Sequence, residues 1–296
     1  MSEGETQEAF FLDTNAVIKW VFETGTPEGR ALSEFIRTLT KGRCFVLGIS
    51  LSELNAIIYD SYDIAARIVY DVVASRQDWD ALGIRDRLRV LDDTMKDFEQ
   101  VYERARYAYF KSYIPPGGIR VELARRFFSA LVRKVVDLDS KALKERVASQ
   151  EKIIDVIDFL DDLEFFIRKM CTVIDDIKAL VDHRTVMKLT LIYEGIRRYY
   201  RKLESQGFNK TPSLMDRAML VELFLLANKG DYGKVVLITD DQDFKRMYRT
   251  ILEYLEVIIS ERTDQRGGLR ELAEELRHVL MNRLEIRATR EVAVQQ

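Results

Sequence analysis

An apolar run passes directly into an acidic loop in KVVLITDDQDF, residues 234–244. The run Lys234–Thr239 shows no polar alternation, which is typical of a strand buried on both faces of a parallel sheet. The acidic loop Asp240–Phe244 follows it, and a helical pattern comes next. The sequence therefore predicts a strand, loop and helix with carboxylates in the loop.

Other parts of the chain show the same order of elements. Ala9–Leu12 is a short apolar run that ends at Asp13 and leads into a helical pattern. Cys44–Ile49 is a second predicted strand, after which a helix should begin at Ser50. A further strand is expected at Leu255–Ile259. Strands that alternate with helices indicate an α/β fold with a parallel sheet and right-handed crossovers.

A long helical region separates the two groups of strands. No convincing strand occurs from about Asn55 to Gly207. Within this region, Ile153–Val181 carries two adjacent apolar rows at spacings of three and four, which predicts one long helix in a bundle. Near the end of the chain, Leu269–Ile286 has the pattern of an amphipathic helix that could dock on the sheet or on another subunit, so a homo-oligomer is one expectation.

Composition limits the class of protein. The chain has 296 residues, of which 47% are hydrophobic, so it can bury a large core. Cys44 and Cys171 lie in apolar stretches without metal-ligand spacing, which favours reduced, buried thiols in a cytoplasmic protein. The first residues are polar and acidic, and no apolar run is long enough for a membrane span. With a net charge of -3, any nucleic-acid surface must come from local clustering of cations.

Four acidic residues lie just past predicted strands or at the start of the following helices: Asp13, Glu53, Asp216 and Asp241. The carboxyl ends of parallel strands open onto one shared crevice, so these side chains can meet there. Clustered carboxylates repel one another unless a cation neutralises them. Oxygen ligands favour Mg²⁺ or Mn²⁺, so the pattern suggests a metal-dependent nuclease.

Each acid also has a purely structural interpretation. Asp13 could cap a helix or a turn. Glu53 could complete a capping box with Ser50. Asp216 suits the first turn of a helix because of the helix dipole, and Asp241 or Asp243 could cap the next helix.

Several of these segments resemble the motifs of PIN-domain nucleases, especially VapC-type toxin ribonucleases. They are Phe10–Asn15, Ile49–Leu54, the helix with Asp216, and Leu237–Phe244. The resemblance covers residues 8–60 and 208–262, which would form one discontinuous PIN-like domain. Residues 61–207 would then be a helical insertion, much longer than that of an ordinary VapC toxin, and 263–296 a helical extension.

The resemblance implies a doubly wound, five-stranded parallel sheet and endonucleolytic hydrolysis of RNA to 5′-phosphate and 3′-hydroxyl ends. The implied catalytic residues are Asp13, Glu53, Asp216 and Asp241. The same four would bind Mg²⁺ or Mn²⁺, with Asp243 as an accessory ligand. Asn15 and Thr239 would orient the carboxylates through hydrogen bonds.

A basic and aromatic cluster precedes the helix with Asp216, and it contains Arg197, Arg198, Tyr199, Arg201 and Lys202. These residues could contact RNA by stacking and by phosphate binding. An amphipathic helix with inward aromatics and solvated cations is the more probable interpretation.

Three functions remain open from the sequence. The first is a toxin ribonuclease that travels with an antitoxin protein. The second is a processing nuclease for tRNA or another structured RNA, because a helical insertion could grip a folded substrate. The third is a catalytically silent PIN scaffold that binds RNA or protein.

Overall fold

Five short apolar segments form a parallel sheet in the computed structural model, which describes residues 7–39, 41–110, 118–175, 182–207, 213–260 and 267–293. The strand order is β3-β2-β1-β4-β5. The central strand β1 pairs with β2 on one side and β4 on the other, and all four pairings are parallel. The strands are β1 (Glu8–Leu12), β2 (Cys44–Leu47), β3 (Thr172–Ile174), β4 (Lys234–Ile238) and β5 (Leu284–Arg287).

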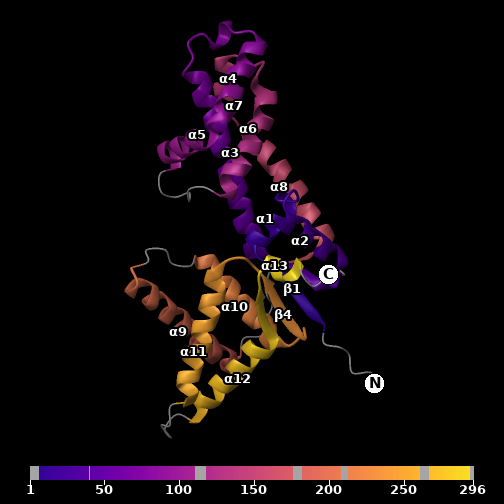
Figure 1. Cartoon of the computed structure of the whole chain (residues 1–296), viewed down its shortest axis with the longest axis vertical. Helices are drawn as coiled ribbons and strands as arrows, with labels where there is room; N and C mark the ends of the chain where they lie inside the picture. The colour runs from indigo at the N-terminus through magenta and orange to yellow at the C-terminus, as the bar shows by residue number, and fades with distance from the viewer. Residues whose placement is uncertain are drawn as a thin grey trace. The chain divides into compact units, whose positions relative to one another are not determined.

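Helices cover both faces of this sheet (Figure 1). On one face, Phe11 and Phe45 join the large core formed with α9 (His183–Ser205), α10 (Leu214–Lys229), α11 (Gln242–Ser260) and α12 (Gly267–Arg283). On the other face, Phe10 packs edge-on against Phe35, with ring centroids 5.1 Å apart. Phe35 belongs to α2 (Pro27–Thr38), which packs against α1 (Thr14–Phe22) and α13 (Thr289–Ala293). The expected α/β class and five-stranded parallel sheet are confirmed.

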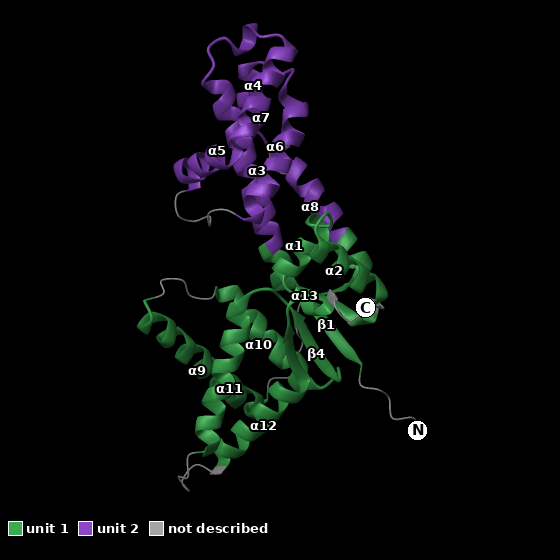
Figure 2. Cartoon of the chain, in the orientation of Figure 1, with its two compact units in different colours: residues 1–53, 166–296 green, residues 54–165 purple. Residues whose placement is uncertain are grey.

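The chain divides into two compact units (Figure 2). Unit 1 contains residues 1–53 and 166–296, and unit 2 contains residues 54–165. Unit 2 is therefore shorter than the helical insertion expected at 61–207, because β3 and α9 belong to unit 1. The segment expected to be a separate extension, 263–296, also belongs to unit 1, where it supplies α12, β5 and α13.

Unit 2 is helical throughout its described part. Trp79, Phe98, Tyr102 and Phe128 are fully buried in its core. Its elements are most of α3 (Gly48–Ala74), η2 (Trp79–Ala81), α4 (Ile84–Lys96), α5 (Phe98–Ala105), η3 (Arg106–Phe110), α6 (Ile119–Val135), α7 (Ser140–Ala148) and most of α8 (Gln150–Met170). The remaining short helix, η1 (Lys41–Arg43), belongs to unit 1.

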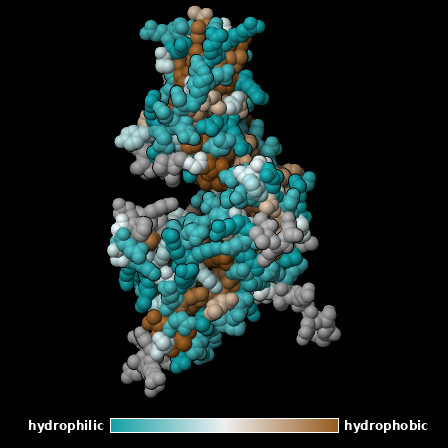
Figure 3. Space-filling model, viewed as in Figure 1, coloured by the Kyte–Doolittle hydropathy of each residue, from teal (hydrophilic) through white to brown (hydrophobic). Residues whose placement is uncertain are grey.

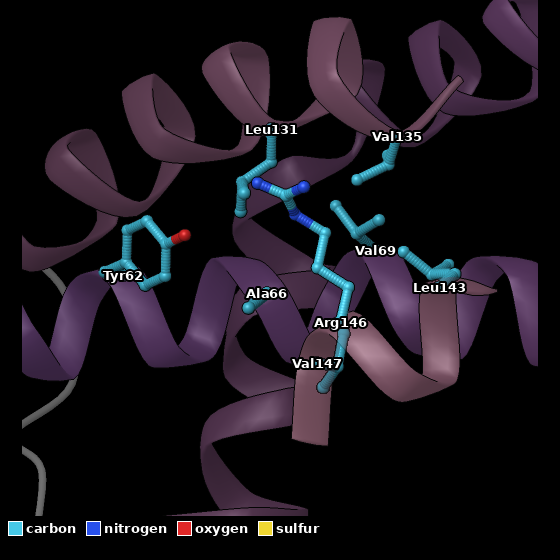
Figure 4. A pocket seen from close by; sticks show the side chains of 8 residues that line it. All are labelled: Tyr62, Ala66, Val69, Leu131, Val135, Leu143, Arg146 and Val147. Atoms are coloured by element: carbon cyan, nitrogen blue, oxygen red, sulfur yellow. The ribbon is translucent and has the colours of Figure 1, made fainter. Parts of the chain in front are cut away.

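A small hollow lies between α3, α6 and α7 of unit 2, with Arg146 reaching across apolar side chains (Figure 4). Its volume is about 10 Å³, so it can hold about one water molecule. Arg146 is already bound to Asp155 at 3.2 Å.

Hydrophilic residues cover most of the visible face of both units (Figure 3). No described helix combines the length and apolar character that a membrane span requires.

Two predictions of secondary structure, one strand and one helix, are wrong. Leu255–Ile259 is the end of helix α11, where Phe244, Met247, Ile251 and Leu255 are buried at helical spacings of three and four. The helix expected at 153–181 ends at Met170, and the β-branched run Thr172–Ile174 forms β3 instead. Residues 176–181 lie outside the described residues, as do Thr211 and Pro212, where the helix with Asp216 was expected to open.

The cysteines are not the free thiols that the sequence favoured, because Cys44 and Cys171 form a disulfide in the structure. Cys44 begins β2 and Cys171 directly precedes β3. The register pairs Phe45 with Thr172, so the two preceding residues, which are the cysteines, lie beside each other. The bond joins positions separated by 127 residues and closes a loop that contains unit 2.

Reduction of this disulfide should destabilise unit 1. In a chain-entropy model a loop of this length contributes about 5 kcal/mol. Differential scanning calorimetry with and without reductant should show a clear fall in Tm for the wild type. The Cys44→Ala/Cys171→Ala variant should have a low Tm that reductant does not change. Equal Tm values for the oxidised and reduced wild type would contradict this role.

Candidate active site

The strand order places a topological switch point at β1, because β2 and β4 lie on opposite sides of it. At such a point the loops after neighbouring strands diverge and leave a crevice at their carboxyl ends, where ligands bind in open α/β sheets. Asp13 follows β1 directly, and Thr239 follows β4. The backbone N–H of Asp13 donates to the carbonyl oxygen of Ile238 at 3.2 Å, which holds these two loops together.

Asp13 is buried at this edge of the sheet, where it is only 2% exposed. Its Oδ1 accepts a hydrogen bond of 2.7 Å from the backbone N–H of Ala16, so it caps α1. Its Oδ2 accepts a hydrogen bond from the hydroxyl of Thr239. Burial raises the pKa of Asp13 to about 7, the two hydrogen bonds oppose this shift, and the nearby charges of Asp241 and Glu53 add to it. Asp13 is thus both a helix cap and part of a group of carboxylates.

Glu53 is held by a residue that the sequence did not indicate. The hydroxyl of Thr14 donates to Glu53 Oε2 at 2.5 Å. Because α3 begins at Gly48, Ser50 lies inside the helix, where its hydroxyl contacts the sulfur of Met219 at 3.9 Å. The alternative capping box of Ser50 and Glu53 is therefore not formed. Thr14 directly follows Asp13, and this adjacency is the signal that could have identified it.

Asp216 does take the structural role that was considered for it. It forms a capping box with Ser213 at the start of α10, in which the N–H of Ser213 donates to Asp216 Oδ2 at 2.7 Å. Burial nevertheless raises the pKa of Asp216, and the charges of Asp241 and Glu53 raise it further. Asp216 therefore shares its surroundings with the same two carboxylates as Asp13.

Asp240 and Asp241, in the acidic loop after β4, have different partners. Asp241 caps α11 by accepting the N–H of Asp243 at 2.7 Å, and its own N–H donates to Thr239 Oγ1 at 3.0 Å. Asp240 instead binds Lys19 at 2.5 Å and accepts the hydroxyl of Thr289 at 2.6 Å. These contacts hold the pKa of Asp240 below its usual value despite burial.

Asp243 contacts Asp241 through its backbone N–H, and its side chain has two other partners. Its Oδ1 accepts a hydrogen bond of 2.8 Å from the hydroxyl of Tyr199 and lies 3.7 Å from a guanidinium nitrogen of Arg246. Burial raises the pKa of Tyr199 to about 12, and the hydrogen bond to Asp243 contributes to the shift. Tyr199 therefore remains a donor throughout the neutral range.

Ion pairs distinguish four of these acids from Asp240 and Asp243, their neighbours in the loop after β4 and at the start of α11. No described Lys, Arg or His forms an ion pair with Asp13, Glu53, Asp216 or Asp241, whereas Asp240 and Asp243 both have basic partners. Together Asp13, Glu53, Asp216 and Asp241 form what we call the acidic site.

The donor chemistry of the acidic site suits a hard divalent cation. All four side chains offer carboxylate oxygens, and each oxygen has lone pairs beyond those used in the hydrogen bonds above. As placed, however, no group of three or more Asp, Glu, His or Cys side chains among the described residues is close enough to form a complete metal-binding set. The charges of Glu53 and Asp241 act on both Asp13 and Asp216, but the four carboxylates do not enclose a cation.

The two residues that were expected to orient the carboxylates, Asn15 and Thr239, have different surroundings. Asn15 is exposed and makes no hydrogen bond to a described carboxylate. The hydroxyl of Thr239 donates to Asp13, and the hydroxyl of Thr14 donates to Glu53.

In the basic cluster, Arg197 pairs with Glu194 at 3.0 Å and Arg198 stacks on Tyr254 at 4.1 Å, as in an ordinary amphipathic helix. Buried Tyr199 faces Asp243, while Arg201 and Lys202 are exposed.

Comparisons of this chain with protein-family models, with curated proteins and with solved structures give no match.

Asp13 and Asp240 should have opposite effects on the pH dependence of the free energy of unfolding. Asp13 ionises near 3.8 when unfolded and near 7 when folded, so its protonated form stabilises the fold below pH 4. This contribution, about 4 kcal/mol for a shift of this size, is lost as the pH rises through 7. In EDTA, Asp13→Asn should therefore raise the free energy of unfolding at pH 8 and change it little at pH 4.

Asp240→Asn is the matched control. The pKa of Asp240 is lowered, so its charge stabilises the fold above its unfolded pKa and the effect is lost as the pH falls through the folded pKa. This variant should be less stable than the wild type at pH 8. Urea unfolding at both pH values measures both effects. A loss of stability in Asp13→Asn at pH 8 would mean that Asp13 is not a destabilising buried charge.

Proposed function

We propose that the protein is a divalent-metal-dependent endoribonuclease of the PIN-domain type, which hydrolyses RNA to 5′-phosphate and 3′-hydroxyl ends. The observation that carries the proposal is that the four carboxylates of the acidic site, at the switch point of the sheet, have no basic partners among the described residues. By contrast, Asp240, in the same loop as Asp241, and Glu285, in β5, are each paired with a lysine. Asp13 is buried, has no cationic partner and lies near the charges of Asp241 and Glu53, so its ionised form is destabilising unless an external cation binds it.

Asp13, Glu53, Asp216 and Asp241 would hold Mg²⁺ or Mn²⁺, with Asp243 as an accessory ligand. When bound, such a cation supplies Lewis-acid stabilisation of phosphate oxygens and lowers the pKa of water. Small side-chain movements must complete the ligand set, because the four carboxylates do not enclose a cation as placed. Cation binding should lower the pKa of Asp13 by favouring its charged form.

Other residues of the chain would position these carboxylates. Thr239 and the N–H of Ala16 fix both oxygens of Asp13, and Thr14 fixes one oxygen of Glu53. Thr239 directly follows β4, and Thr14 lies two residues after β1, so both hydroxyls are carried next to rigid strands.

The proposal includes a biological setting, which is an RNA toxin with a protein antitoxin or a nuclease that processes structured RNA. The genomic neighbourhood distinguishes them, because a toxin should have a small antitoxin gene beside its own. The alternative of a silent scaffold is disfavoured by the unpaired acids, which a binding surface for RNA would not need.

The proposal predicts that purified protein with Mn²⁺ or Mg²⁺ cleaves single-stranded RNA and that EDTA abolishes the activity. Asp13→Asn and Glu53→Gln should each reduce the cleavage rate by at least about a hundredfold, because each removes a charge that would hold the cation. Time courses with end-labelled RNA on denaturing gels measure the rates. Asp86→Asn, an exposed change in unit 2, is the control and should cleave at the wild-type rate. Equal activity of the wild type and Asp13→Asn would remove the basis for the proposal.

A further inference from the structure

A pocket of about 310 Å³ lies between helices α9 and α11 of unit 1. Helix α9 contributes Lys202, the residue after its end is Gln206, and α11 contributes Arg246, Arg249, Thr250 and Glu253. The two helices lie side by side (Figure 1) and pack extensively against each other. The pocket is as large as the smaller pockets that bind organic ligands.

The backbone packing of the two helices sets the spacing of the pocket walls. Gly195 of α9 faces Ile251 of α11 so closely that a Cβ on Gly195 would lie 3.0 Å from the Cα of Ile251. A close crossing of this kind needs a glycine, because a larger residue would push the helices apart. The side chains that line the pocket are therefore carried by a rigid helix pair.

The pocket is positively charged within a chain of net charge -3. Three of its lining residues are cations, Lys202, Arg246 and Arg249, and one is an acid, Glu253. In the described part of the chain, Lys202 and Arg249 have no carboxylate partner, and both are exposed. Elsewhere in unit 1, cations such as Arg184 have acidic partners. Unpaired cations in a concave site are suited to an anionic ligand.

Hydrogen bonds connect this pocket to the acidic site. Tyr199 lines the pocket, and its hydroxyl donates to Asp243. Asp243 in turn donates its N–H to Asp241, a member of the acidic site. Arg246 lines the pocket and also lies 3.7 Å from Asp243. Tyr199 and Arg246 therefore place the pocket next to the loop that carries Asp241.

We propose that this pocket binds the phosphate backbone of single-stranded RNA beside the bond that is cut. The inference rests on the proposed function for its choice of RNA. The guanidinium groups of Arg246 and Arg249 match phosphate oxygens in bidentate geometry. Lys202 adds a third charge, and Gln206 and Thr250 offer hydrogen bonds to sugar and phosphate oxygens. An acidic peptide would find the same charges, but it would gain nothing from a position next to the acidic site.

The test is RNA binding by a variant that keeps the acidic site intact, Lys202→Gln/Arg249→Gln. Fluorescence anisotropy with a short labelled single-stranded RNA in EDTA measures binding without cleavage. The variant should bind at least tenfold more weakly. Its plot of log K against log salt should be shallower by about 1.4, because two phosphate contacts are lost. With metal present, KM should rise while kcat stays near the wild-type value.

The matched control is Arg89→Gln/Lys141→Gln, which removes two exposed cations from unit 2 and changes the net charge equally. It should bind RNA like the wild type. Equal weakening by both variants, or none by the pocket variant, would overturn the inference. So would tighter, pocket-dependent binding of a labelled oligoglutamate peptide, which would assign the pocket to an acidic protein partner.

The two proposals fail in distinguishable ways. If the wild type cleaves RNA and the pocket variant binds it normally, the pocket inference is wrong and the nuclease stands. If the wild type binds RNA through the pocket and cleaves none with either metal, the nuclease is wrong and the pocket stands as an RNA-binding site.

Discussion

The parallel pairing of β1 with β4 is the constraint on which the acidic site depends. It aligns Leu12 with Ile238, so the residues that follow each strand, Asp13 and Thr239, meet at one edge of the sheet. Both strands are buried on both faces, with helices on each side. A register shift of one residue would move every side chain of β1 to the opposite face of the sheet, so burial fixes the register. The hydrogen bond between Thr239 and Asp13 follows from this register and not from local sequence.

Cationic partners separate Asp240 from the four carboxylates of the acidic site. Asp240 and Asp241 are neighbours in one loop, but Asp240 has Lys19 and Thr289 as partners, while Asp241 has only backbone and hydroxyl contacts. Asp13 has no cation and is nearly inaccessible, which gives the opposite pKa shift from Asp240. The fold tolerates this destabilising carboxylate because the surrounding core is large. Such local conflicts are expected at functional sites and rare elsewhere.

The sequence predicted the strands whose pattern has no helical alternative, namely β1, β2 and β4. It missed β5 because Leu284–Arg287 alternates apolar and polar residues over only four positions, which an amphipathic helix also allows. It missed β3 because three residues, Thr172–Ile174, carry too little periodicity to end the helical pattern before them. The disulfide could not be predicted for the same reason, since only the pairing of β2 with β3 brings Cys44 and Cys171 together. The burial of Asp13 likewise depends on long-range packing.

The structural and functional interpretations of the acids are compatible, although the sequence presented them as alternatives. Asp13 and Asp216 both cap helices through one oxygen, and the same hydrogen bonds fix the orientation of each carboxyl group. A capping acid is confined to the amino end of its helix, where the helix dipole favours its negative charge. In a parallel sheet, the helix after each strand begins at the carboxyl edge, so caps of successive helices gather along one rim. Local capping rules therefore help to place the carboxylates, and the strand order determines which of them become neighbours.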